Sequence, residues 1–276
     1  MEIDGKVAIV TGASRGVGAA TAALLAARGA RVVCAARSTE AAPQPIPGTL
    51  DATVGRIRAA GGEAIAVPTN LGRDDDVTAM VDAAISTYGG VDILVNNAAI
   101  TFPGDLAMEP KRFDLVMQVD LRAPLLALRA CIPSMTARGG GAVVNVSSVA
   151  GLNYIPGLMA YGMAKAALEH LTVSAAHQLA PVGIAVNGFR IDVPVASEGF
   201  VFNLPDVDHS DWEPSEVAAE GIVWMIEQPA AWSGHNEGMA ALRAEHRIMA
   251  SRAGRPHTQS PDLVTRTHLR PLHPGV

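Results

Sequence analysis

The chain has 276 residues and a net charge of −6, and 49% of its residues are apolar against 17% that are charged. That length and apolar content are enough to bury one large core, so we expect a single α/β domain. An acidic chain without a basic patch is not expected to have nucleic acid as its main partner, and an aromatic content of 4% is poor for stacking on bases.

The N-terminal region carries no membrane or export signal. Arg28 and Arg31 interrupt the apolar stretch 19–36, and their charges exclude a membrane span there. Glu2 and Asp4 lie where a secretory signal would have a basic start followed by an apolar run. We therefore predict a cytoplasmic protein with no membrane partner.

The cysteines and histidines show no recognisable site. Cys34 and Cys131 are far apart in the sequence, so we expect apolar core residues and no disulfide or redox pair. The histidines form no His-Glu-x-x-His pattern, and His257, His268 and His273 fall in a proline-containing tail. We therefore predict no metal site.

Short β-rich runs alternate with longer runs of helical periodicity. This alternation is typical of repeated βαβ units, which build a parallel sheet covered by helices on both faces. Such a sheet binds its ligand beyond the carboxyl ends of its strands. The predicted strands are 6–10, 31–36, 63–67, 91–95, 142–146 and 184–187, and the predicted helices are 16–28, 50–60, 74–88, 108–134 (mainly helix), 158–179 and 214–227.

Two segments break this alternation. Residues 38–48 contain Pro43, Pro45 and Pro47, which predict a loop after the second strand. A last strand is only weakly suggested around residues 236–242, and the rest of the chain has several prolines and little periodicity. We therefore expect one domain over 1–242 and an irregular tail over 243–276.

A glycine-rich turn joins the first strand to the first helix. Its sequence is Thr-Gly-Ala-Ser-Arg-Gly-Val-Gly, and its glycines Gly12, Gly16 and Gly18 allow a tight turn and a close approach of the backbone to a ligand. A helix N-terminus at this point would attract a pyrophosphate. The alternative is a glycine-rich turn that binds nothing.

This Thr-Gly-x-x-x-Gly-x-Gly pattern resembles the signature of the short-chain dehydrogenase/reductase family, and the resemblance extends over residues 5–187. Asn96-Asn97-Ala98-Ala99 resembles the family's Asn-Asn-Ala-Gly turn, which steadies the sheet and borders the cofactor. The resemblance implies a Rossmann-type doubly wound sheet and a nicotinamide cofactor. The cofactor-binding residues expected in the first half of the chain are Gly12, Ser14, Arg15, Gly16, Val17, Gly18, Asn97 and Ala98, together with Asn70 and Leu71 at the adenine end.

The choice between NAD and NADP depends on the end of the second strand. A NAD site usually has an acid there to bind the ribose 2′-hydroxyl, but this chain has Ala36 followed by Arg37. Arg15 lies in the glycine-rich turn, where a cation opposes the helix dipole and indicates an anion nearby. We predict that Arg15 and Arg37 hold a 2′-phosphate, which makes NADP(H) the cofactor. The alternative is a pair of solvated arginines.

A tyrosine and a lysine one helical turn apart follow the fifth strand. An ammonium group beside a phenol favours the phenolate, so Lys165 is expected to lower the pKa of Tyr161 toward the range useful for proton exchange. By itself, such a pair is more often an ordinary surface pair. In the family a serine precedes the tyrosine at a set spacing, and Ser148 matches that spacing. The resemblance implies that Ser148 binds the substrate oxygen, Tyr161 exchanges its proton, and Lys165 also holds the nicotinamide ribose.

The chain departs from the family's pattern at two positions near these residues. Asp120 replaces an asparagine that seats a water of a proton relay, and it remains open whether Asp120 serves the relay or slows it by pairing with Lys165 or Arg122. The usual Pro-Gly pair after the sixth strand is missing, so Ile191 and Val193 are the nearest residues for contacts with nicotinamide. Asp120 is thus a fourth candidate catalytic residue.

Taken together, these features predict an NADP(H)-dependent oxidoreductase that transfers a hydride between nicotinamide and a ketone or secondary alcohol. The segments 152–159 and 194–204 are expected to line a fairly apolar substrate pocket. The alternative is a non-catalytic NADP(H)-binding regulatory or structural protein on the same fold, which Asp120 and the missing Pro-Gly favour. The resemblance also implies a homodimer or homotetramer.

Overall fold

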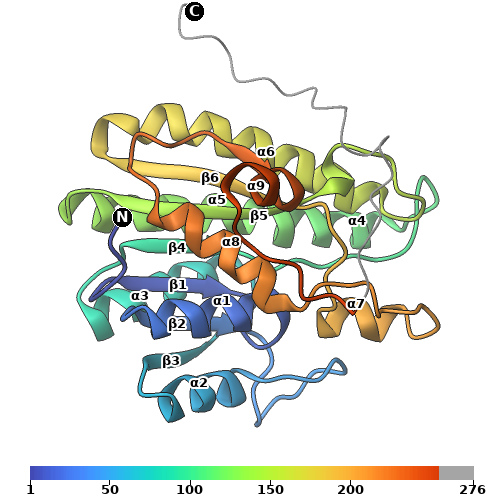
Figure 1. Ribbon diagram of the computed structural model, residues 1–276, viewed down its shortest axis with the longest axis horizontal. Helices are drawn as coiled ribbons and strands as arrows, with labels where there is room; N and C mark the ends of the chain where they lie inside the picture. Colours follow the sequence, from blue (N-terminus) through green and yellow to red (C-terminus); the bar gives the residue numbers. More distant parts are fainter. Residues whose placement is uncertain (255–276) are drawn as a thin grey trace, which may run out of the picture.

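A seven-stranded sheet forms the centre of the molecule (Figure 1). The structure is a computed structural model, and it describes residues 1–254. The strands are β1 (Val7–Thr11), β2 (Arg31–Ala36), β3 (Glu63–Pro68), β4 (Ile93–Asn96), β5 (Gly141–Ser148), β6 (Ile184–Ile191) and β7 (Asn236–Gly238). The helices are α1 (Gly16–Ala27), α2 (Leu50–Ala59), α3 (Asp74–Tyr88), α4 (Pro110–Met117), α5 (Ala123–Ala137), α6 (Met159–Leu179), α7 (Glu198–Asn203), α8 (Ser215–Glu227) and α9 (Met239–His246), with the short turns η1 (Gln118–Arg122), η2 (Val149–Gly151) and η3 (Ala180–Val182).

All neighbouring strands run parallel, in the order β3-β2-β1-β4-β5-β6-β7. Figure 1 shows this order from β3 at the bottom to β6 near the top, with α6 above the sheet. The first three strands extend the sheet in one direction, from β1 through β2 to β3. The next strand, β4, pairs with the other side of β1. The switch point between β1 and β4 is where doubly wound sheets bind ligands. The predicted Rossmann-type fold is confirmed.

The two faces of the sheet explain why β1 is apolar at every position. Val7 and Ile9 pack into a cluster with α3, α5 and α6, whereas Ala8 and Val10 pack into a second cluster with α1, α2 and α8. A strand covered on both faces needs continuous apolar residues, and each buried valine or isoleucine side chain contributes about 1.5–3 kcal/mol. Cys34 and Cys131 lie one in each cluster; both are free and fully buried, which confirms them as core residues.

The C-terminal part differs from the sequence-based expectation. The last strand covers only Asn236–Gly238, and the residues that follow form α9. Oδ1 of Asp192 accepts a hydrogen bond of 3.1 Å from the N–H of Ala240. Asp192 therefore caps this helix although it is far from it in the sequence. The expected domain end at residue 242 falls inside α9, so the segment 243–246 is helical and not an irregular tail.

Residues beyond α9 also contact the domain. The N–H groups of Arg252 and Ala253 donate to Oε2 of Glu213, at 2.8 Å and 3.1 Å. The chain is therefore held to the domain at least as far as Ala253. The tail histidines singled out in the sequence lie outside the described residues.

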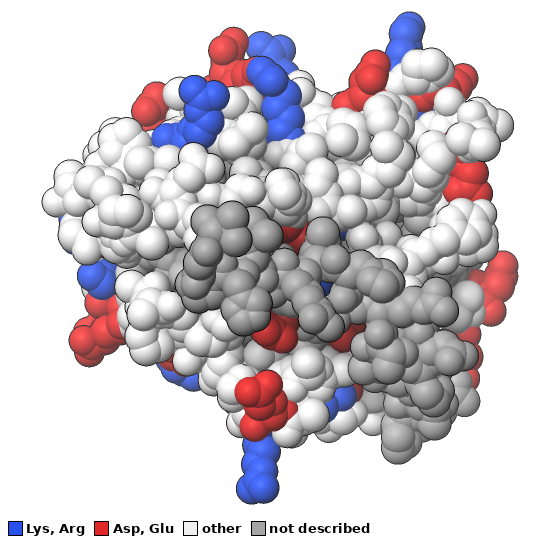
Figure 2. Space-filling view, turned by 90° about the horizontal axis from the view of Figure 1, so that it is seen from above, with Lys and Arg blue, Asp and Glu red and all other residues white. Residues whose placement is uncertain are grey.

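The charged side chains of residues 1–254 on one face of the molecule are distributed as the composition suggests, without a basic patch. Acidic and basic side chains are intermixed around the face shown in Figure 2, and neither sign forms a continuous patch among its described residues. Among the described helices, none has the length and apolarity needed to cross a membrane. Within the same residues, no group of three or more His, Cys, Asp or Glu side chains is placed to hold a metal ion.

Candidate active site

The glycine-rich turn has the backbone geometry that its sequence indicates. Gly12 and Gly16 have φ values of +70° and +56°, in the left-handed region that favours glycine. A Cβ at Gly18 would lie 2.4 Å from the carbonyl oxygen of Gly12, so only glycine allows α1 to approach the turn this closely. Helix α1 begins at Gly16, and within residues 1–254 no side chain caps it. Its first N–H groups are therefore suited to an anion such as a pyrophosphate.

The Asn-Asn turn after β4 is bonded to the end of β1. Asn97 donates from its backbone N–H to Oγ1 of Thr11 at 3.0 Å and from Nδ2 to the Thr11 carbonyl at 2.9 Å. Ala98 donates from its N–H to the same Oγ1 at 3.1 Å. The side-chain amide of Asn97 is thus a structural donor at the switch point. Thr11 is part of the glycine-rich signature, but its bonds to Asn97 and Ala98 could not be predicted, because a threonine at the end of a strand looks like an ordinary β residue.

Behind this turn, a chain of amides joins β4 to α6. Nδ2 of Asn96 donates to Oδ1 of Asn145 at 2.9 Å, and Nδ2 of Asn145 donates to Oγ1 of Thr172 at 2.9 Å. All three side chains are buried. These bonds hold the carboxyl ends of β4 and β5 against α6, which carries the proposed catalytic tyrosine and lysine.

Asn70 and Leu71, the two residues expected to contact adenine, differ in the exposure of their side chains. Asn70 is exposed, and its Oδ1 accepts a hydrogen bond of 3.0 Å from the N–H of Gly72. Leu71 is buried in the hydrophobic cluster around α3, so its side chain belongs to the core. Any contact of Leu71 with a cofactor would have to come from its backbone.

The loop between β2 and α2 holds Arg15. Nε of Arg15 donates to the carbonyl of Pro47 at 2.7 Å, and Nη2 donates to the carbonyl of Gly48 at 3.0 Å. The hydroxyl of Ser38 donates to the same Gly48 oxygen at 2.7 Å. Arg37 is exposed at the end of β2. The segment predicted as a loop therefore also orients one of the two arginines proposed for the 2′-phosphate.

The charges around Arg15 are mixed. Burial lowers the pKa of Arg15, the Glu198 carboxylate raises it, and the positive charge of Arg37 lowers it. The two arginines therefore lie close enough to repel each other, as expected of a pair that shares an anion. Glu198 is an anion that the sequence analysis did not assign to this site.

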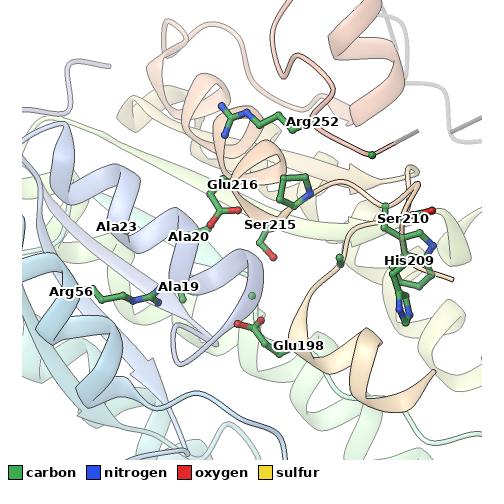
Figure 3. A pocket seen from close by; sticks show the side chains of 15 residues that line it. Ala19, Ala20, Ala23, Arg56, Glu198, His209, Ser210, Ser215, Glu216 and Arg252 are labelled. Carbon is green, nitrogen blue, oxygen red and sulfur yellow. The ribbon is translucent and has the colours of Figure 1, made fainter. Parts of the chain in front are cut away.

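Glu198 comes from α7, which lies beyond the carboxyl ends of the strands (Figure 1). A Cβ on Gly16 would lie 3.1 Å from Cβ of Ser197 and 3.4 Å from Oε2 of Glu198. Figure 3 shows Glu198 at the N-terminal end of α1, pointing with Glu216 into a cavity of about 570 Å³ between α1 and α8. A carboxylate thus lies beside the backbone that would bind a pyrophosphate.

Ser148, Tyr161 and Lys165 lie near one another. The Ser148 hydroxyl lies close enough to the Tyr161 hydroxyl to lower its pKa, and Nζ of Lys165 lies 5.4 Å from the centre of the Tyr161 ring. Nζ of Lys165 also donates to the carbonyl of Val146 at 2.8 Å. The side chains are placed by the end of β5 and by successive turns of α6. Ser148 Oγ further accepts from the N–H of Ala150 at 3.2 Å, which sets the start of η2.

Asp120 lies in a π-helical turn between α4 and α5. The N–H of Ala123 bonds the carbonyl of Gln118, five residues earlier, and Pro124 has no N–H to offer the carbonyl of Asp120. The carboxylate is fully buried; its Oδ1 accepts from the N–H of Ile100 at 2.9 Å, while its Oδ2 has no hydrogen-bond partner among the described residues. Arg122 instead binds Asp74 on α3, so the considered pairing of Asp120 with Arg122 is not formed.

The electrostatics of this site correct one expectation. Burial and the Asp120 carboxylate raise the pKa of Tyr161, while the Ser148 side chain lowers it. Burial lowers the pKa of Lys165, and Asp120 and Glu169 raise it. Burial raises the pKa of Asp120 to about 6, against the opposing effect of Lys165. The expected lowering of the Tyr161 pKa is therefore wrong for this arrangement, because burial and the Asp120 carboxylate raise the pKa more than Ser148 lowers it.

The end of β6 carries the residues that replace Pro-Gly. Ile191 is partly buried against the core, and Val193 is almost fully buried in it. Burial raises the pKa of Asp192, and hydrogen bonds from the N–H groups at the start of α9 lower it. The structure thus gives Asp192 a capping role that no sequence signal indicated. Contacts of Ile191 and Val193 with nicotinamide remain predictions, which would use their backbone.

Comparisons with known proteins agree with this geometry. A model of the short chain dehydrogenase family matches residues 6–192. The human protein "Dehydrogenase/reductase SDR family member 4" is 35% identical over 184 residues, which is 66% of this chain and 63% of that protein. The "3-oxoacyl-[acyl-carrier-protein] reductase" of Synechocystis sp. is 39% identical over 184 residues, covering 66% of this chain and 71% of that enzyme. The match thus spans less than two thirds of the human relative.

Two solved structures extend the similarity over more of the chain. A putative dehydrogenase from Xanthomonas campestris has a TM-score of 0.81 at 30% identity, covering 93% of this chain and 96% of the other. A metagenomic short-chain oxidoreductase in complex with NADP has a TM-score of 0.71 at 32% identity, covering 86% and 96%. This chain belongs to the short-chain dehydrogenase/reductase family of oxidoreductases, which use a nicotinamide cofactor.

Proposed function

We propose that this protein is an NADP(H)-dependent reductase of ketones, acting through Ser148, Tyr161 and Lys165. The observation that carries the proposal is the proximity of the Ser148 side chain to the Tyr161 hydroxyl, with the Lys165 ammonium 5.4 Å from the centre of the tyrosine ring. Two hydroxyls that converge in this way can both bind one substrate oxygen. The Tyr161 side chain is only partly buried.

The raised pKa of Tyr161 favours the direction of reduction. A phenol that keeps its proton at neutral pH can donate it to the oxygen of a carbonyl substrate. Ser148 holds that oxygen as negative charge develops on it, and Lys165 stabilises the phenolate that remains. NADP(H), when bound, supplies the hydride for the carbonyl carbon. Oxidation of an alcohol would instead need the phenolate form at the start.

The preference for NADP(H) is supported by the residues at the end of β2. Ala36 leaves no carboxylate there to repel a 2′-phosphate, while Arg15 and Arg37 bring two positive charges together. The glycine-rich turn and the uncapped N-terminus of α1 fit the pyrophosphate. One related solved structure is a complex with NADP. Glu198, beside Gly16, opposes an anionic cofactor in this region.

The decisive experiment compares the wild type with Tyr161→Phe. Both proteins are titrated with NADPH and then assayed with a panel of ketones by the loss of NADPH absorbance. The proposal expects the wild type to turn over at least one ketone, while the variant binds NADPH with a similar Kd and turns over almost nothing. If the wild type binds NADPH but reduces no ketone, the protein is a non-catalytic NADP(H)-binding protein.

The assembly and the compartment stay predictions. A homodimer or homotetramer is expected from the family, and size-exclusion chromatography with light scattering would test it. Cell fractionation would test the proposed cytoplasmic location.

A further inference from the structure

A buried ion pair lies next to the proposed catalytic residues on the side of β6. Arg190 donates from Nε to Oε1 of Glu169 at 2.8 Å and from Nη2 to Oε2 at 2.6 Å. Ser147 donates from Oγ to Oε1 of Glu169 at 2.8 Å. Glu169 is 1% exposed, Ser147 2% and Arg190 7%. The proposed proton transfer does not use this cluster, so its burial needs another explanation.

Each member of the cluster adjoins a residue of the site. Ser147 directly precedes Ser148 at the end of β5, and Glu169 lies one turn beyond Lys165 on α6. Arg190 directly precedes Ile191 at the end of β6. The Glu169 carboxylate therefore connects the strand of the catalytic serine, the helix of the catalytic lysine and the strand that leads to the predicted nicotinamide contacts.

A fourth element is tied to the same residue. Nδ2 of Asn236, on β7, donates to the backbone carbonyl of Glu169 at 3.1 Å. A Cβ on Gly188 would lie 2.0 Å from Oδ1 of Asn236, so β6 needs a glycine there to admit this side chain. The packing around Glu169 thus constrains residues of β6 and β7 as well as its direct partners.

Stability alone is a weak reason for such a pair. Removing two charges from water costs several kcal/mol per ion, and well-packed apolar residues in their place are often as stable or more so. A buried, fully bonded carboxylate does hold its partners in one geometry, because any displacement leaves a charge unpaired. A cluster of this kind is therefore better suited to fixing positions than to raising the free energy of unfolding.

The Lys165 ammonium is the charged group of the site that faces this cluster. Nζ of Lys165 is surrounded by Asp120 from η1, Tyr161 and Glu169 from its own helix, and the Val146 carbonyl from β5. Arg190 lies on the far side of Glu169, whose two oxygens it binds. Among these groups, Asp120 and Glu169 are the anions that oppose the effect of burial on the lysine.

We propose that Glu169, held by Arg190 and Ser147, is a positioning residue that fixes β5, α6 and β6 around the Ser148, Tyr161 and Lys165 site. The proposal rests on the proposed function. Its electrostatic consequence is that Glu169 helps to keep Lys165 in the ammonium form. If the cluster were only part of the core, its loss would change the free energy of unfolding but not the chemistry of Lys165.

Four variants of the full chain separate these roles. Glu169→Gln removes the charge with little change of shape, and the double variant Glu169→Gln with Arg190→Met removes both charges. Asp92→Asn is the matched control: Arg138 binds Asp92 through Nε and Nη2, both at 2.8 Å, and Asp92 is 2% exposed. Asp92 precedes β4, at the amino end of the sheet and away from the site. Tyr161→Phe serves as the inactive reference.

Two readouts are used, and one does not depend on turnover. The first is kcat, KM and Kd for NADPH with an accepted ketone. The second is an NMR titration of protein labelled with [ε-13C]lysine, where Lys165 is assigned against Lys6 and Lys111. The free energy of unfolding is measured for every variant, so that loss of stability can be told from loss of function.

The proposal expects Glu169→Gln to lower kcat about ten- to a hundredfold while Kd for NADPH changes less than about threefold. The Lys165 titration moves to lower pH in Glu169→Gln and stays in place in Asp92→Asn, which keeps kcat close to that of the wild type. The double variant regains stability, because no buried charge is left unpaired, but it does not regain kcat.

The proposal is overturned if Glu169→Gln lowers kcat no more than Asp92→Asn does, or if the double variant recovers kcat together with stability. An unchanged Lys165 titration in Glu169→Gln also overturns it, even in a protein that reduces no ketone. A wild type that binds NADPH and never turns over contradicts the proposed function instead, and in that case the lysine titration alone decides the role of Glu169.

Discussion

Oδ1 of Asp120 accepts a hydrogen bond of 2.9 Å from the backbone N–H of Ile100, whereas Oδ2 of the same buried carboxylate has no hydrogen-bond partner among the described residues. An unpaired buried oxygen is costly for an ionised group and less so for a protonated one. Burial accordingly raises the pKa of Asp120 from 3.8 to about 6. The position where the family has a neutral asparagine thus holds a carboxyl group that titrates close to neutral pH.

Replacing Asp120 with asparagine should stabilise the protein above pH 6. Between pH 3.8 and about 6 the unfolded chain releases the Asp120 proton and the folded chain keeps it, so the free energy of unfolding of the wild type falls across this window. The free energy of unfolding of Asp120→Asn does not fall in this way, so the variant should be more stable than the wild type at pH 7 by about 1–3 kcal/mol. Urea unfolding at pH 4 and pH 7 measures the difference, which should be much smaller at pH 4; equal differences at both values would contradict the assignment.

The same variant should shift the pH profile of ketone reduction. The Asp120 charge raises the pKa of Tyr161, so its removal lets the tyrosine lose its proton at lower pH. The alkaline limb of the pH profile of kcat/KM should therefore move to lower pH. Asp114→Asn, an exposed change of the same charge on α4, is the control and should leave the limb in place. An unmoved limb in Asp120→Asn would show that Asp120 does not act on Tyr161.

Arg37→Ala should weaken the binding of NADPH much more than that of NADH. Arg37 lies at the end of β2 beside Arg15, and only NADPH carries the 2′-phosphate that they are proposed to bind. We expect the Kd for NADPH to rise about tenfold or more. Arg56→Ala, an exposed arginine of α2, removes the same charge as a control. Equal losses for both cofactors in Arg37→Ala would refute the role of the arginine in specificity.

Gly48→Ala tests whether the loop that holds Arg15 matters for the cofactor. Gly48 has a φ of +107°, and a Cβ there would lie 2.6 Å from the Ser14 carbonyl oxygen and 2.8 Å from Cβ of Arg15. The variant should lose about 1–3 kcal/mol of stability and bind NADPH more weakly. Gly55→Ala is the matched control in α2, where nothing lies within 4 Å, and it should gain about 0.5–1 kcal/mol. Thermal unfolding and NADPH titration check both; an undisturbed Kd in Gly48→Ala would separate the loop from the cofactor site.

Glu198→Gln should tighten the binding of both NADPH and NADH. The Glu198 carboxylate lies beside Gly16, where the pyrophosphate common to both cofactors would bind. Because Glu198 is exposed, the gain should be modest, about two- to fivefold, and should shrink as salt is added. Glu216→Gln changes a second exposed acid of the same cavity. If both variants give the same gain, the effect comes from overall charge and not from the position of Glu198.

The sequence predicts most of the central sheet and the residues that meet at the site, because both leave local patterns. The apolar strands, the glycine-rich turn and the spacing between Ser148 and Tyr161 are all visible in the sequence. Helix α7 and the cap of α9 by Asp192 are not, and β7 is only weakly suggested, because these features depend on contacts between segments far apart in the chain. The same holds for the pKa of Tyr161, since its direction depends on burial and on Asp120, which only the folded arrangement brings near.

The hydrogen bond between Asp192 and Ala240 joins the end of β6 to the start of α9. Any opening movement at the end of β6 has to carry α9 with it or break this cap. Truncations that cut into residues 239–246 should therefore alter how quickly the cofactor enters and leaves. Purified material with no tag is the safer choice for measuring cofactor exchange, because the Met1 ammonium also donates to the carbonyls of Glu227 and Gln228 at the end of α8.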